Sequence, residues 1–255
     1  MKFIPKKIIF SVIIGAVGFS VFLNHLSIAN QMSRLIKLSE ERYPGDSIFQ
    51  EFTYGLFVFN IPLGRFVFKV EEESDSTGRA IYLLNGSLRP WNFLNKISGD
   101  RMGLSLISRL DHASLLPYSF EQTTPLAIRK GKRGRVIDYY HGELFMTRKN
   151  QELDIQDDTK DPLATIFWLM RRDYEDQKII KSTLNINPRV YWVIGRAHSK
   201  GELIRVNAKI LKVNQGYETL RVNPAEIYLI KRGEWYLPLW LTMEVMHIKI
   251  HMKIL

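Results

Sequence analysis

Apolar and polar residues alternate along most of the chain beyond residue 46. The alternation is clear in Phe52–Val58 and again in Met102–Leu110. A period of two residues is typical of a strand that buries one face. Groups of turn-forming residues, such as Asn60–Gly64 and Lys231–Glu234, separate these runs. The pattern therefore predicts a β-rich domain made of antiparallel hairpins.

One segment has helical spacing instead. After Asp161 and Pro162, apolar residues recur on one helical face at Leu163, Ile166, Phe167 and Met170. Aspartate is a good N-cap and proline suits the first helical position, so a helix is predicted over 162–173. We expect a mainly β fold: one antiparallel sheet of about ten to twelve strands, strongly curved or barrel-like, around this helix. Residues 46–255 would form this single domain, and residues 30–45 a short helix or tether.

The N-terminus has the pattern of an export signal. Met1–Lys7 carries three lysines, Ile8–Leu23 has no charge, and Ser27-Ile28-Ala29 provides small residues before a possible cleavage site. A positive region, a short apolar region and a small-x-small motif indicate a signal peptide at 1–29, cleaved after Ala29. The alternative is an uncleaved membrane anchor. In either case we expect the remainder in the periplasm, tethered to the inner membrane if cleavage does not occur.

Several short motifs resemble one bacterial family. They are a hairpin with Ile61–Gly64, a strand at Tyr82–Ser87 leading into Trp91–Ile97, the helix start Asp161–Ala164 continuing to Arg171, and Leu237-Pro238 near the end. Together they resemble the envelope family catalogued as domain of unknown function 3108. The resemblance implies an exported, β-rich domain of a Gram-negative envelope. It implies no settled activity and no catalytic residues.

Charge and composition narrow the function classes. The chain has 36 Lys and Arg against 26 Asp and Glu, a net charge of +10, and no cysteine, which excludes lipoprotein acylation, thiolate catalysis and cysteine-based metal sites. Five positive charges lie close together at Arg129, Lys130, Lys132, Arg133 and Arg135. This basic loop could contact an anionic membrane surface, or it could be a hairpin tip that charge keeps soluble. Because the domain is exported, we expect no nucleic-acid partner.

Motifs for catalysis and metal binding are weak. There is no nucleophile elbow, phosphate-binding loop or dinucleotide fingerprint. An acidic cluster at Asp154, Asp157, Asp158 and Asp161 fits helix capping and solvation better than calcium binding or glycan hydrolysis. His247 and His251 lie on an alternating strand pattern, roughly 13 Å apart, too far for one ion. We expect no enzymatic activity, no cofactor and no metal.

The aromatic residues give the best indication of binding. Large apolar side chains occupy both faces of the first hairpin, so one face needs a cover from the helix, a partner or a lipid-like ligand. We predict a ligand site formed by Phe57, Phe59, Phe66, Phe68, Phe167 and Met170. The expected function is non-enzymatic binding of an apolar or amphipathic envelope component. The alternatives are an accessory module for a protein partner in envelope assembly and, third, a glycan hydrolase.

Overall fold

The computed structural model describes residues 30–255 except 46, 59–60, 93, 95, 97–102, 133, 149–150, 187–188, 214–218 and 246–247. Its contacts divide the chain into two units, one ending at Pro44 and one beginning at Gly45. In the first unit, residues 30–42 form a helix. The predicted signal peptide lies outside the described residues. Among the residues that are described, no helix is both long and apolar enough to cross a membrane.

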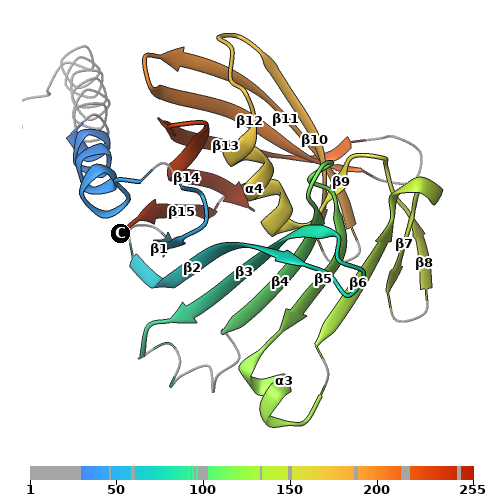
Figure 1. Cartoon of the computed structure of the whole chain (residues 1–255). Coiled ribbons are helices and arrows are strands. Elements are labelled where there is room, and N and C mark those ends of the chain that lie inside the picture. The colour runs from blue at the N-terminus through green and yellow to red at the C-terminus, as the bar shows by residue number, and fades with distance from the viewer. Residues whose placement is uncertain are drawn as a thin grey trace, which may run out of the picture. The chain divides into compact units, whose positions relative to one another are not determined.

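In the second unit, the described residues form one sheet of fifteen strands (Figure 1). In chain order they are β1 (Glu51–Val58), β2 (Ile61–Ser74), β3 (Ala80–Pro90), β4 (Leu104–Asp111), β5 (Pro117–Thr123), β6 (Arg135–Tyr140), β7 (Phe145–Arg148), β8 (Gln151–Asp154), β9 (Thr159–Lys160), β10 (Ile179–Ile186), β11 (Arg189–Lys200), β12 (Leu203–Val213), β13 (Thr219–Arg232), β14 (Trp235–Val245) and β15 (Ile248–Ile254). The helices α3 (Pro125–Arg129) and α4 (Pro162–Arg171) complete the main elements.

The sheet order is β8-β7-β6-β5-β4-β3-β2-β1-β15-β14-β13-β12-β11-β10-β9, and its pairs are antiparallel except for the short parallel pair β9–β10. The mainly β class is therefore confirmed. The prediction of ten to twelve strands was too low, and β8 and β9 are free edges, so the sheet is not a closed barrel. Its two halves lie on opposite sides of α4 (Figure 1).

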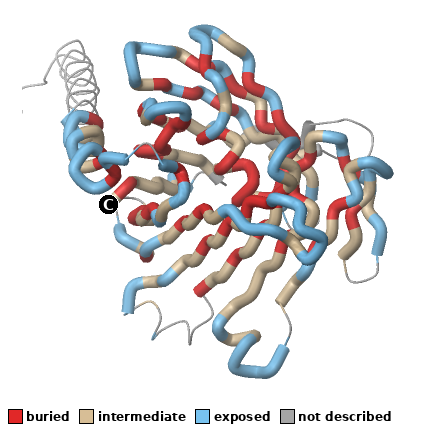
Figure 2. Tube along the Cα trace, in the orientation of Figure 1, coloured by how far each residue is buried: buried red, intermediate tan, exposed pale blue. Residues whose placement is uncertain are grey.

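Alternating burial along the strands defines the two faces of the sheet (Figure 2). In β3, Tyr82, Leu84 and Gly86 are buried. The residues that follow each of them, Leu83, Asn85 and Ser87, are partly exposed. Leu84 pairs with Val70 on β2 and with Ser108 on β4, both of them buried. Directly paired residues lie on the same side of a sheet. We call this side, which faces α4, the inner face.

The main helix begins as the sequence predicts. The Asp161 carboxylate accepts hydrogen bonds from the backbone N–H of Leu163 at 2.8 Å and of Ala164 at 3.0 Å, and Pro162 occupies the first turn. Leu163 and Phe167 are 0% exposed. A Cβ at Gly86 would lie 2.8 Å from Leu163 Cδ2, so the missing side chain lets α4 approach β3 closely. The helix therefore fills the centre of the curved sheet.

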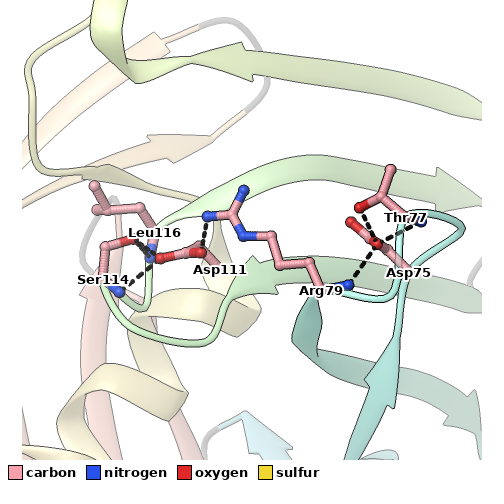
Figure 3. A network of polar contacts seen from close by, with 6 residues as sticks. All are labelled: Asp75, Thr77, Arg79, Asp111, Ser114 and Leu116. Carbon is pink, nitrogen blue, oxygen red and sulfur yellow. Dashed lines mark hydrogen bonds and ion pairs between the residues drawn. The ribbon is translucent and has the colours of Figure 1, made fainter.

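Two turns are joined by a polar network (Figure 3). Asp75 accepts hydrogen bonds from Thr77 and from the backbone of Arg79, and the Arg79 guanidinium pairs with Asp111. Asp111 also accepts from Ser114. The hydrogen bonds from Thr77 and Arg79 lower the pKa of Asp75. The network connects the β2–β3 turn to the β4–β5 turn.

Candidate functional site

Partly buried apolar side chains cross the inner face in a continuous row. Phe66 pairs with Leu88, and Leu88 pairs with Leu104. On the other side, Leu56 pairs with Met252, and the row extends to the Met243–Ile250 pair. All of them keep some exposure, unlike the core residues beside them. We call this set the apolar stripe: Leu56, Phe66, Leu88, Leu104, Met243, Ile250 and Met252.

The length of the apolar stripe suits a hydrocarbon chain. It crosses the six neighbouring strands β14, β15, β1, β2, β3 and β4. At about 4.8 Å between strands, these five steps span about 24 Å. One leaflet of a bilayer has a hydrocarbon thickness of about 15 Å, half of the roughly 30 Å core. An acyl chain can therefore lie along the stripe with its whole length in apolar contact.

Two arginines lie on the same face beyond the stripe. Arg135 pairs with Gln122, which pairs with Leu106 on the inner face of β4. On β7, Met146 pairs with Tyr139 of β6, and Arg148, two residues further, points to the same side. Burial lowers the pKa of Arg135, and the nearby charge of Arg148 lowers it further. The two guanidinium groups are therefore close neighbours on the inner face.

A buried polar cluster lies at the start of α4, between strands from the two halves of the sheet. Ser108 Oγ donates to Asp161 Oδ2 at 2.6 Å, and both residues are 0% exposed. Burial raises the pKa of Asp161 to about 6, although the hydrogen bonds from Ser108, Ala164 and Leu163 act against this. Tyr139 Oη donates to Asn185 Oδ1 at 3.5 Å, which connects β6 to β10. This cluster joins β4 to the start of α4 and β6 to β10 through side chains.

The structure separates the predicted aromatic site. Phe66 belongs to the apolar stripe, whereas Phe68, Phe167 and Met170 are 0% exposed in the core. Phe57 lies on the outer face, where its ring covers Gly55 and Lys253 Nζ lies 5.4 Å from the ring centroid. Phe59 lies outside the described residues. Of the five described, only Phe66 is a partly exposed residue of the inner face.

The basic loop is separated in the same way. Arg129 ends the short helix α3, which the sequence did not predict, and Lys130 and Lys132 are exposed after it. Arg133 lies outside the described residues. Arg135 begins β6 and points inward. Sequence reasoning missed its neighbour Arg148, because only the β6–β7 pairing brings the two together.

Two residues of the acidic cluster, Asp158 and Asp161, have structural roles. Asp158 accepts hydrogen bonds from the backbone N–H and the hydroxyl of Thr183, at 3.1 and 2.6 Å. Asp161 caps α4, as predicted. Within the described ranges, no three His, Asp or Glu side chains are grouped so that they could hold a metal ion. His247 lies outside those ranges.

A separate pocket of about 500 Å³ lies beside the last residue of α4. It is lined by Ser47, Ile48, Phe49, Glu72, Tyr82, Arg171, Gly233, Glu234 and Trp235. Tyr82 is six residues from Leu88 along β3, about 20 Å away, so this pocket is distinct from the stripe. Its rim mixes two carboxylates with one guanidinium. This nearly balanced charge selects no class of ligand, whereas the inner-face strand positions around Arg135 and Arg148 carry charge of one sign.

Comparisons with known proteins give the following result. No family model matches the sequence, so the resemblance to domain of unknown function 3108 finds no support there, and no curated protein matches. Among solved structures, the chain is similar to a β-barrel-like protein of domain of unknown function DUF1849 from Brucella abortus. The TM-score is 0.48 and the identity 11%, with 80% of this chain and 95% of that chain covered.

Proposed function

We propose that this chain is an exported, non-enzymatic envelope protein that binds an apolar or amphipathic molecule on the inner face of its sheet. The apolar stripe carries the proposal. Its side chains lie on the inner face beside the core but remain partly exposed. Apolar surface grouped in this way is characteristic of ligand-binding or interaction sites.

The free energies indicate an amphipathic ligand rather than a purely apolar one. Burying a side chain the size of leucine contributes about 1.5–3 kcal/mol, so covering the remaining surface of seven side chains contributes roughly 5–10 kcal/mol. Association costs about 4–15 kcal/mol in lost freedom of motion. The apolar contact therefore does little more than offset this cost. A stable complex requires additional polar contacts from the same ligand.

The N-terminal sequence supports the proposed location. A positively charged segment followed by sixteen uncharged residues is typical of export. We place the domain in the periplasm, tethered to the inner membrane where residues 1–29 are retained. There it would meet envelope lipids and their soluble precursors.

Photolabelling tests this function. The full chain, purified in a neutral detergent, is exposed to a monoacylglycerol with a diazirine in its acyl chain, and the labelled peptides are mapped. We expect saturable labelling of peptides that contain Phe66, Leu88 or Leu104. Because Leu104 lies on the inner face, Leu104→Asp should reduce this labelling at least tenfold.

The matched control lies on the same strand. Ile107 points to the outer face of β4 and is also partly buried, so Ile107→Asp should leave the labelling unchanged. Labelling confined to residues 1–29 or to the outer face would overturn the proposal. Labelling that does not saturate would overturn it as well.

A further inference from the structure

We infer that Arg135 and Arg148 bind the phosphate head of an amphiphile whose hydrocarbon tail lies on the apolar stripe. This inference rests on the proposed function and names the chemical class of the ligand. The head would be a phosphate ester joined to a single acyl chain. Arginine recognises phosphate through paired N–H donors, which distinguishes it from lysine.

The guanidinium groups have unused donors. Nε and Nη1 of Arg135 and Nε of Arg148 are shielded from solvent and have no hydrogen-bond partner among the described residues. A buried donor left without a partner costs about 1–3 kcal/mol, and more when it is charged. An anion between the two groups would satisfy these donors and remove the cost.

The surrounding charge is unbalanced. Across β4–β8, the described inner-face positions are leucine, serine, proline, phenylalanine, glutamine, arginine, isoleucine, tyrosine and methionine. None of these strand positions carries a carboxylate, and the Asp161 carboxylate reaches this face at Ser108. Arg135 and the position of Arg148 are diagonal neighbours on adjacent strands, a separation of about 7–8 Å. Two like charges at this distance repel each other in the free protein. A bound dianion would reverse this repulsion.

The position of the pair selects a lipid-like phosphate rather than a free one. Leu104, at the end of the apolar stripe, lies on β4, two strands from Arg135 on β6 and two residues from the position opposite it, so about 12 Å separate them. Gln122 lies between the two strands and adds an uncharged polar side chain. A head group joined by a short polar linker to an acyl chain matches this succession of charged, polar and apolar surface.

A titration with two lipids that have the same acyl chain tests the inference. Native mass spectrometry of the full chain measures the binding of oleoyl lysophosphatidic acid and of monoolein, which lacks the phosphate. We expect the phosphate lipid to bind at least tenfold more tightly. In Arg135→Gln/Arg148→Gln, the two lipids should bind equally, at the affinity of monoolein for the wild type.

The control is a second arginine pair. Arg65 and Arg89 face each other across β2 and β3 but are exposed on the outer face, so Arg65→Gln/Arg89→Gln removes the same charge and should keep the tenfold preference. Equal binding of both lipids to the wild type would overturn the inference and leave the proposed function intact. Failure of both lipids to bind would overturn the proposed function itself. Displacement of the lipid by millimolar inorganic phosphate would assign the pair to free phosphate and contradict the inference.

Discussion

Phe167→Ala is expected to lower the free energy of unfolding by about 3–5 kcal/mol, the usual cost of emptying the place of a fully buried phenylalanine. Phe167 is 0% exposed, and its ring packs at a tilt against Tyr82, with 4.9 Å between the centroids. Urea unfolding of the full chain at equilibrium measures the loss. The same variant should still bind monoolein while it is folded, because Phe167 lies in the core and not on the apolar stripe.

Ile166→Ala is the matched control on the same helix. Ile166 is partly exposed, so its truncation should cost only about 1–2 kcal/mol. If Phe167→Ala kept the stability of the wild type and lost the lipid, Phe167 would be a ligand contact. The assignment of this residue to the core would then be wrong.

Asp161→Ala is expected to cost about 2–4 kcal/mol of stability at pH 5. The substitution removes the N-cap of α4, worth about 0.5–2 kcal/mol, and leaves the buried Ser108 hydroxyl without its partner, at about 1–3 kcal/mol. Asp161→Asn retains an oxygen for the two backbone N–H groups and a donor for Ser108. Its stability at pH 5 should therefore stay close to that of the wild type.

The buried Asp161 also gives the stability a defined pH dependence. Its pKa is about 6 in the folded chain, above the ordinary value of 3.8, so the folded state binds the proton more tightly than the unfolded state does. The stabilisation is complete below pH 4 and is lost as the pH rises through 6, a change of about 3 kcal/mol. Asp161→Asn has no such proton and should be the more stable protein at pH 8. Urea unfolding of both proteins at pH 5 and at pH 8 tests this. If the wild type and Asp161→Asn lost the same free energy of unfolding between the two pH values, the raised pKa of Asp161 would be contradicted.

Local sequence patterns predicted the regular elements well. The cap at Asp161, the helix after it and the turn at Lys231–Glu234 follow from spacing and turn residues, and all three are confirmed. The missed elements are short. β9 has two residues and β8 has four, mostly polar, so neither offers enough positions for an alternation to be recognised.

The site was predicted less well, because it depends on which strands become neighbours. An alternating sequence shows that a hairpin has two faces but does not show which one turns inward. A register shift between Leu56 and Phe57 further changes the alternation. The predicted site took Phe57 from one face of the hairpin and Phe66 from the other, and in the folded sheet the two lie on opposite faces. Arg148 is a single charge in a short strand, and only the folded sheet places it beside Arg135.

The most direct test of ligand binding on the inner face is to measure whether the protein purified from its host carries a bound lipid. The full chain is expressed with its own N-terminal segment, purified in a neutral detergent, analysed by native mass spectrometry and then extracted for lipid. We expect each wild-type protein molecule to carry one anionic lipid with a single acyl chain. The Leu104→Asp variant should carry none. A wild-type chain that carries no lipid, and takes up none from an extract of the host's own envelope, would contradict the account.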